Sequence, residues 1–186
     1  MGTAREVTQA CEMRVGSVDD IELLCGIDAD ASQLYVAAGL ELSFPDDPAF
    51  SRAERRQWLV SLACGDVLIA AEPGGRAVGF AATRMLDAQP HLEQLSVLRS
   101  FMRKGIGRAL LDATERMARK SGADSLTLTT YSHLAWTRPF YERAGFSILP
   151  DTGCGPEILE VLAYERYWLP CADRRVAMRK VFADAV

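Results

Sequence analysis

The sequence contains no long hydrophobic run and no large excess of charge of either sign. No segment approaches the roughly 18 apolar residues that a membrane-spanning helix needs. The 21 basic and 25 acidic residues leave a formal net charge of −4. The chain therefore lacks the broad positive surface of proteins that bind nucleic acid or anionic membranes, and we expect it to bind neither.

Cysteine is scarce and follows no pattern. Its five residues are far apart and form no C-x-x-C or Cys/His ligand spacing: Cys11, Cys25, Cys64, Cys154 and Cys171. This usage indicates reduced thiols in a cytoplasmic protein and argues against a metal site. The N-terminus also lacks the apolar segment of a secretion signal, so we expect a cytoplasmic location.

The chain is long enough for one globular domain with a sizeable core, since 49% of its 186 residues are hydrophobic. We expect a flexible tail over residues 1–11 and a single domain over 12–183. Because homodimers are the commonest homo-oligomers, a homodimer is the default expectation.

Hydrophobic periodicity predicts alternating strands and helices. The predicted strands are 12–15, 66–72, 77–85, 91–97, 125–131, 146–148 and 174–182. The predicted helices begin near 17, 51, 107, 136 and 157, and residues 28–50 are expected to be less regular. The fold class is therefore α+β, with a mixed sheet of about seven strands flanked by helices as an α/β/α sandwich.

The loop before the third helix combines cations with glycines. Arg103, Lys104 and Arg108 surround Gly105 and Gly107, and an amphipathic helix follows. Glycine lets a backbone turn tightly and bring its N–H groups close to a ligand. A helix start adds unpaired N–H groups and partial positive charge, so this loop predicts a binding site for phosphate.

Two common phosphate motifs do not fit this loop. A Walker A loop requires Lys-Ser/Thr after its last glycine, and these residues are missing here. A dinucleotide fingerprint requires a third glycine, but Leu110 stands at that position. An NTPase and a dinucleotide-binding protein are both disfavoured.

The stretch 97–110 resembles the acyl-CoA loop of the GCN5-related N-acetyltransferase (GNAT) superfamily. A second block, Phe140-Tyr141-Glu142-Arg143-Ala144-Gly145-Phe146, is similar to that family's F-Y-x-x-x-G-F segment. The order and spacing of the two blocks agree with the family, and the resemblance extends from Glu12 to Val181.

The resemblance implies that acetyl-CoA is the co-substrate and that no metal is needed. Its pyrophosphate would bind at the glycine loop, and its pantetheine arm would lie where strand 91–97 splays from strand 125–131. The implied cofactor-binding residues are Leu95, Ser96, Val97, Met102, Arg103, Lys104, Gly105, Ile106, Gly107, Arg108, Thr130, Thr137 and Phe140.

The sequence departs from the family pattern at two positions. Met102 stands where the family has Gln or Arg before the first glycine, and Leu134 stands where an Asn is common. The first change predicts weaker rather than abolished binding, since the backbone makes most of the contacts. His133 or Thr137 are the candidates to replace the missing Asn.

Acylation of an amine requires a base, because a lysine-like amine is protonated at neutral pH. Glu93 and His91 lie two residues apart on the strand beside the cofactor, so both side chains point to one face in regular pleat. Glu93 is the favoured general base and His91 the second candidate. By the resemblance, Tyr141 donates a proton to the leaving thiolate, and a backbone N–H near Leu95 polarises the thioester carbonyl.

Structural readings compete with these roles. Glu93 is alternatively a solvated strand residue, His91 a hydrogen-bonding residue, and Tyr141 a packing residue. A ping-pong route through Cys154 is disfavoured, because a loop thiol without a base is usually inert. A catalytically silent acyl-CoA-binding module is the rival function.

The acceptor amine is not identified by the sequence. In the family it enters opposite the cofactor, here near residues 35–47 and 153–167. These segments carry acidic residues that could favour a cationic amine: Glu41, Asp46, Asp47, Glu157 and Glu160. The candidate acceptor-binding residues are Tyr35, Phe44, Tyr131 and Glu160.

Overall fold

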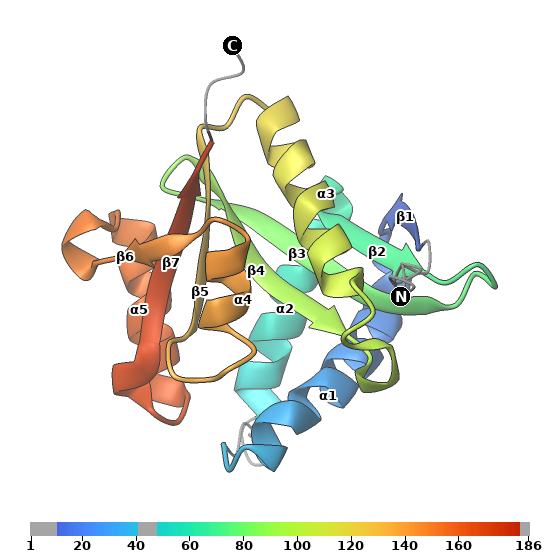
Figure 1. The fold of residues 1–186 in the computed structure, drawn as a ribbon, viewed down its shortest axis with the longest axis horizontal. Coiled ribbons are helices and arrows are strands. Elements are labelled where there is room, and N and C mark those ends of the chain that lie inside the picture. The colour runs from blue at the N-terminus through green and yellow to red at the C-terminus, as the bar shows by residue number, and fades with distance from the viewer. Residues whose placement is uncertain (1–10, 41–47, 183–186) are drawn as a thin grey trace, which may run out of the picture.

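The computed structural model describes residues 11–40 and 48–182, and in these residues a seven-stranded sheet forms the centre of the molecule (Figure 1). The strand order is β1-β2-β3-β4-β5-β7-β6. The strands are β1 Glu12–Val15, β2 Val67–Ala71, β3 Ala77–Leu86, β4 Gln89–Val97, β5 Ser125–Tyr131, β6 Ser147–Leu149 and β7 Arg175–Val181. All neighbouring strands are antiparallel except β4 and β5, which are parallel.

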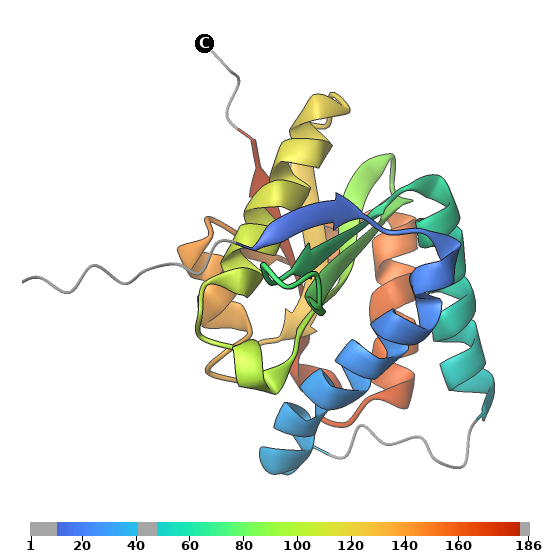
Figure 2. The same cartoon turned by 90° about the vertical axis from the view of Figure 1, so that its right-hand side faces the viewer.

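Helices cover both faces of the sheet, as the two perpendicular views show (Figures 1 and 2). The helices are α1 Ile21–Ala37, α2 Pro48–Cys64, α3 Ile106–Lys120, α4 Arg138–Arg143 and α5 Pro156–Trp168. Helices α1, α2 and α5 lie on one face, and α3 and α4 lie on the other. This arrangement confirms the expected α+β sandwich.

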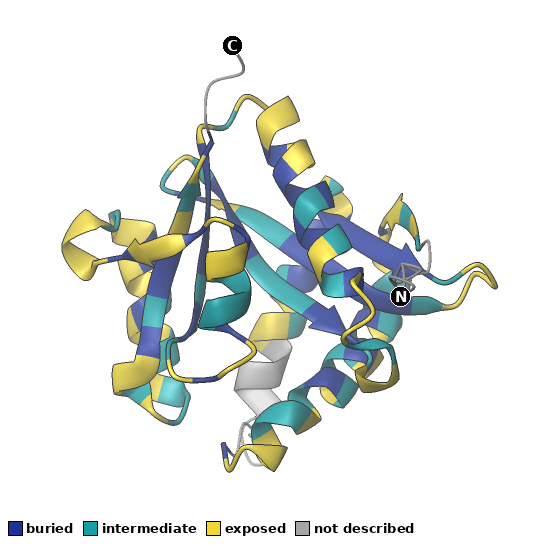
Figure 3. Ribbon diagram, in the orientation of Figure 1, coloured by how far each residue is buried: buried dark blue, intermediate teal, exposed yellow. Residues whose placement is uncertain are grey.

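The alternation of side chains along β2 explains why both faces are covered. Val67 and Ile69 pack into the cluster with α1 and α2, whereas Leu68 and Ala70 pack into the cluster with α3. Successive side chains of a strand point to opposite faces, so a strand that is apolar at every position requires a helix layer on each side. Buried residues lie along the strands and on helices of both covering layers (Figure 3).

The parallel pair β4 and β5 separates soon after it begins. Only His91 pairs with Thr127 and Leu92 with Leu128 in this register. In the antiparallel pairing with β3, Ala82 stands opposite Gln94 and Thr83 opposite Leu92. Glu93 therefore has no partner and is the extra residue of a β-bulge, which bends a strand and increases its twist. The gap between β4 and β5 begins at this bulge.

The structure differs from the sequence expectation over residues 28–37, which continue helix α1. The expectation of an irregular segment there was wrong. The buried positions of α1 are Ile21, Leu24, Ile27 and Ala31, whose spacing of three and four residues is that of one helix face. The apolar face of the helix therefore continues beyond Ile27 to Ala31, and the helix itself continues to Ala37. Helix α2 likewise begins earlier than expected, at Pro48.

Candidate active site

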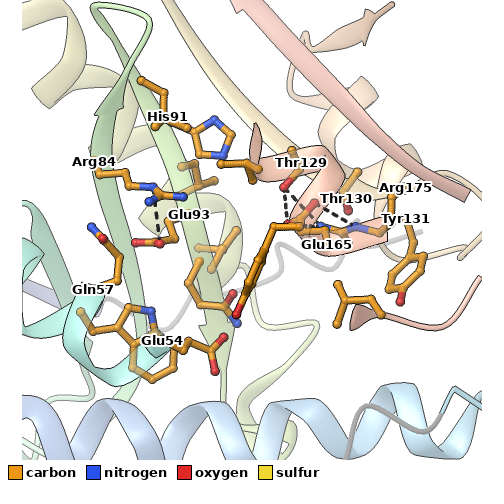
Figure 4. A pocket seen from close by; sticks show the side chains of 18 of the residues that line it. Glu54, Gln57, Arg84, His91, Glu93, Thr129, Thr130, Tyr131, Glu165 and Arg175 are labelled. Carbon is orange, nitrogen blue, oxygen red and sulfur yellow. Dashed lines mark hydrogen bonds and ion pairs between the residues drawn. The ribbon is translucent and has the colours of Figure 1, made fainter. Parts of the chain in front are cut away.

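A pocket of about 800 Å³ lies on the face of the sheet covered by α1, α2 and α5. Side chains from these three helices, from β3, β4, β5 and β7, and from α4 line its walls. Residues of the separating strands β4 and β5 form part of its lining (Figure 4). The pocket therefore opens at the point where the sheet divides.

Tyr141 connects the two faces of the sheet at this gap. It belongs to α4, where its ring packs against Phe140 and Phe146 at centroid distances of 5.1 and 5.8 Å. It also lines the pocket on the opposite side. Burial raises the pKa of its hydroxyl above the usual value, so the phenol is neutral and carries its proton at physiological pH.

Glu93 projects from the bulge of β4 into the pocket (Figure 4). Its Oε1 lies 3.5 Å from Nε of Arg84 on β3. Its Oε2 is buried and has no hydrogen-bond partner among the residues that the structure describes. Burial raises the pKa of Glu93 to about 7, although Arg84 opposes the shift. A carboxyl group of this pKa is suited to take up a proton at neutral pH.

His91 lies on the same strand but in a different environment. Its side chain is 1% exposed, and Nδ1 lies 2.9 Å from Oγ1 of Thr127. Burial lowers the pKa of His91 to about 3, and the nearby charges of Arg84 and Arg175 contribute. The imidazole is therefore neutral and bonds β4 to β5 just before the strands separate. This position favours a structural role over that of the base.

The pocket contains charged residues that sequence reasoning missed. Glu165 of α5 accepts hydrogen bonds from Thr129 at 2.7 Å and pairs with Arg175 at 2.6 Å. Arg175 also lies over the ring of Tyr131 at 4.7 Å. No sequence signal marked this network, because its members come from α5, β5 and β7 and meet only in the folded chain.

Two further carboxylates approach from the first helices. Asp28 of α1 accepts a hydrogen bond from Oγ of Ser96 at 2.8 Å, and burial raises its pKa. Glu54 of α2 lines the pocket and is exposed to solvent on its outer side; desolvation by the pocket walls together with the charges of Asp28 and Glu93 raises its pKa to about 7. The pocket lining thus contains the acids Asp28, Glu54, Glu93, Glu157, Glu160 and Glu165 against the cations Arg84 and Arg175.

Three of the four residues expected to bind the acceptor line this pocket. They are Tyr35, Tyr131 and Glu160, and Phe44 lies outside the described residues. The rings of Tyr35 and Tyr131 lie 6.0 Å apart. The hydroxyl of Tyr131 donates to the carbonyl of Pro170 at 2.8 Å, so this side chain is fixed at one end of the pocket.

The glycine loop has the tight backbone that its sequence suggests. Arg103 and Gly105 adopt left-handed conformations with φ of 62° and 83°. Helix α3 begins at Ile106, and the N–H of Ala109 donates to the carbonyl of Gly105 at 2.9 Å. The N–H groups before Ala109 in this first turn have no intrahelical acceptor. They form a cradle of donors suited to an anion.

The side chains around this loop have separate contacts. Arg108 donates from Nε to Asp112 at 2.8 Å, and its NH1 donates to the carbonyl of Arg143 at 3.3 Å. Nζ of Lys104 lies 4.6 Å from the ring centroid of Phe101. Ile106 is buried, and Met102 and Phe140 pack against the same core. The cradle is thus mainly backbone, with these cations at its border.

The backbone of β4 presents donors to the gap. The N–H of Leu98 donates to the carbonyl of Val78 on β3 at 2.8 Å. Successive N–H groups along a strand point to opposite edges, so those of Leu95 and Val97 point away from β3. Beyond Leu92 the register pairs no residue of β5 with β4. These two N–H groups therefore face the opening between the strands.

The remaining candidate residues lie around the same gap. Thr130 is buried and lines the pocket. The hydroxyl of Thr137 donates to the carbonyl of Tyr131 at 2.6 Å, so this donor holds the start of α4. Leu134 is buried, and the ring of His133 lies 5.5 Å from that of Tyr131.

The described residues contain neither a thiol at Cys154 with a lowered pKa nor a cluster of metal ligands. Burial and the charges of Asp151 and Asp87 raise the pKa of Cys154, which disfavours its thiolate as a nucleophile. Within residues 11–40 and 48–182, no three His, Cys, Asp or Glu side chains are grouped as a metal site requires.

The described helices include none with the length and hydrophobicity of a transmembrane span.

Comparison with curated proteins identifies acetyltransferases as relatives. Mycothiol acetyltransferase of Propionibacterium freudenreichii subsp. shermanii is 37% identical over 95 residues, which cover 48% of this chain and 30% of that protein. Uncharacterized N-acetyltransferase YjcF of Bacillus subtilis (strain 168) is 31% identical over 78 residues, which cover 42% of this chain and 54% of that protein. The matches span about a third to a half of these relatives.

Solved structures with the same fold belong to the same class. PaiA N-acetyltransferase from Thermoplasma acidophilum, crystallised with coenzyme A, superposes with a TM-score of 0.69 at 18% identity, over 93% of this chain and 99% of that one. The ribosomal-protein-S18-alanine N-acetyltransferase from Escherichia coli gives 0.63 at 16% identity, over 95% and 97%. Residues 32–146 match the Acetyltransferase (GNAT) family. This match covers more than half of the sequence, and the chain belongs to that family.

Proposed function

We propose that this protein transfers an acetyl group from acetyl-CoA to a primary amine by direct attack within a ternary complex. The observation that carries the proposal is the position of Glu93. Its carboxyl group has a pKa near 7 and projects into the pocket from the bulge at which β4 and β5 separate. A proton acceptor at this gap would lie between an acyl donor bound along one strand and an amine bound in the pocket.

The residues around the gap fit coenzyme A. The backbone donors at the start of α3 suit its pyrophosphate, and the N–H groups of Leu95 and Val97 suit its extended pantetheine arm, which would bond as a neighbouring strand does. A Cβ added at Gly107 would lie 3.8 Å from Cγ2 of Val97, so the surface beside the cradle is closely packed but not obstructed. Relatives of this fold crystallised with coenzyme A support the assignment.

The chemistry requires the reacting nitrogen to lose two protons. Glu93 takes one proton from the ammonium group and passes it to water, and the freed lone pair attacks the thioester carbon. The N–C bond forms as the C–S bond breaks, while the N–H of Leu95 bonds the carbonyl oxygen. Tyr141 gives its proton to the sulfur, and the second proton of the nitrogen restores the phenol. General acid and base groups of this kind typically contribute roughly 10² to 10⁴ in rate.

The charge of the pocket favours an acceptor with a second positive group. Arg84 pairs with Glu93 and Arg175 with Glu165, which leaves other carboxylates of the lining without a basic partner among the lining residues. An acceptor that remains cationic after its reacting nitrogen has lost a proton would neutralise them. The aromatic walls formed by Tyr35 and Tyr131 would also accommodate a cation.

An amine panel tests the proposal. Release of free thiol from acetyl-CoA is measured with monoamines, diamines, amino acids and peptides, and coenzyme A binding is measured by calorimetry. We expect turnover with at least one amine and higher kcat/KM for acceptors with a second cation. Tight coenzyme A binding without turnover on any amine would favour the silent binding module. The cytoplasmic location and the homodimer remain predictions, and sedimentation analysis tests the latter.

A further inference from the structure

Arg84 makes an asymmetric contact with the carboxylate of Glu93. Its Nε lies 3.5 Å from Oε1, and Oε2 receives no hydrogen bond from any described residue. The two side chains are 29% and 18% exposed, so water screens the pair incompletely. One carboxylate oxygen thus lies at ion-pair distance from a positive charge, without a hydrogen bond between Nε and Oε1, and the other is buried and accepts no hydrogen bond from the described residues.

The register of the sheet creates this contact. Arg84 on β3 stands opposite His91 on β4, and the bulge places Glu93 just beyond that pair. Without the extra residue, Glu93 would stand in register with Thr83 or Ala82 on β3. Arg84 itself lines the pocket, so its guanidinium reaches Glu93 from the side of the sheet on which the acceptor would bind.

We propose that Arg84 is a positioning residue whose charge holds Glu93 as a carboxylate at the wall of the pocket in which the acceptor amine would bind. This inference rests on the proposed function of Glu93 as the base. Arginine suits the role because its guanidinium stays charged throughout the physiological pH range and is weakly hydrated, which lowers the cost of partial burial.

The surrounding charges make such a partner necessary. Burial and the charge of Glu165 raise the pKa of Glu93, and Arg84 is the group that lowers it. The titratable and charged groups that face this part of the pocket from the packed elements are Asp28, Glu54, His91, Tyr141, Glu165 and Arg175. Most of the charged members are acidic, and Arg175 already pairs with Glu165. Removal of Arg84 would therefore leave Glu93 protonated at neutral pH.

The experiment compares pH profiles of kcat/KM for the wild type, Arg84→Gln and Arg84→Lys. An opposite charge beside a carboxyl lowers its pKa by roughly one to three units. We therefore expect the acidic limb of Arg84→Gln to move up by at least about one unit. From a pKa near 7, this shift lowers kcat/KM at pH 7 about fivefold. Arg84→Lys keeps the positive charge, so the pKa of its acidic limb should stay near the wild-type value.

Arg14→Met is the matched control, because Arg14 also pairs with a carboxylate, Asp20 at 2.6 Å, but lies outside the pocket lining. Its profile should not move. If the pH profile of Arg84→Gln coincides with that of the wild type while Glu93→Gln is inactive, the inference about Arg84 is overturned. The proposed role of Glu93 as the base then still stands. Full activity in Glu93→Gln overturns the proposed base itself.

A second measurement does not depend on turnover. Infrared difference titration follows the carboxyl band of Glu93, which is assigned by its loss in Glu93→Gln. The band should titrate at higher pH in Arg84→Gln than in the wild type, and an unchanged titration contradicts the proposal. If Arg84→Gln does not fold, Arg84→Met, which also removes the charge, is titrated in its place. Its midpoint should rise by at least about one unit, and an unchanged midpoint overturns the proposal.

Discussion

His91 and Glu93 lie two residues apart on β4 and line the same pocket, yet burial changes their protonation in opposite ways. The pKa of His91 falls to about 3 and that of Glu93 rises to about 7. Both shifts favour the neutral form, as desolvation does for any ionisable group. Of these two residues, Glu93 is therefore the one that titrates near neutral pH, and its Oε2 is buried without a hydrogen-bond partner in the described residues.

Glu93→Gln should lower kcat at pH 7 by at least tenfold, because the amide cannot accept the proton of the acceptor amine. Coenzyme A affinity should stay unchanged, as measured by calorimetry, since in the proposed complex the backbone of β4 and of the glycine loop would make those contacts. Glu12→Gln on the exposed edge strand β1 is the control. An unchanged rate would transfer the role of the base to water or to His91.

His91→Gln tests the structural role of His91 through stability. The unfolded chain binds a proton on histidine near pH 6.5, whereas the folded chain binds it near pH 3. The stability that this lowered pKa provides is therefore present above pH 6.5 and is lost as the pH falls toward 3. Urea unfolding at pH 7 and pH 5 should show the stability difference between wild type and variant shrinking by about 2 kcal/mol. An equal difference at both pH values would show that His91 is accessible to protons in the folded state.

Gly107→Asp and Gly107→Ala form a matched pair for the phosphate cradle. A Cβ at this position makes ordinary contacts, at 3.8 Å to Val97 and 3.9 Å to Phe140, so Gly107→Ala should bind coenzyme A nearly as the wild type does. Gly107→Asp adds a negative charge beside the pyrophosphate and should lower affinity by at least tenfold. An acidic residue in the first turn favours the helix, so the loss should occur without unfolding. Full affinity of Gly107→Asp in calorimetry would contradict the assignment of the loop.

Tyr141→Phe should lower kcat at least tenfold, because it removes the phenol that we propose as the proton donor to the leaving sulfur. The ring contacts with Phe140 and Phe146 remain, so the melting temperature should change little. Tyr167→Phe, at a position that is 79% exposed, is the control. A Tyr141→Phe variant with wild-type kcat would indicate that water protonates the thiolate and that Tyr141 serves packing alone.

Glu54→Gln should weaken the binding of dicationic acceptors in a pH-dependent manner. Desolvation by the pocket walls and neighbouring acids raise the pKa of Glu54 to about 7, so the wild-type residue is largely neutral at pH 6 and ionised at pH 8. The KM of a diamine should therefore be similar in both proteins at pH 6 and about fivefold higher in the variant at pH 8, as expected for one charge interaction of about 1 kcal/mol. A monoamine is the control substrate. A diamine KM that does not differ at pH 8 would remove Glu54 from acceptor binding.

The sequence by itself determined the strands and most of the helices, although not residues 28–37 of α1, and it determined the glycine loop. Strand β5 follows from strict alternation, and helix α3 from its apolar face and from Gly105 at a left-handed turn. These are local properties of a few neighbouring residues, so their patterns are readable along the chain. The same sequence left Glu93 and His91 as competing candidates for the base.

Only the tertiary structure decided the environment of those candidates. The bulge at Glu93 depends on register with β3, and the contact with Arg84 depends on that bulge. The network of Glu165 with Arg175 joins α5 to β7. Desolvation and ion pairing arise from groups brought together across the fold. The pKa values that distinguish the carboxylate of Glu93 from the buried imidazole of His91 therefore cannot be read from residue spacing.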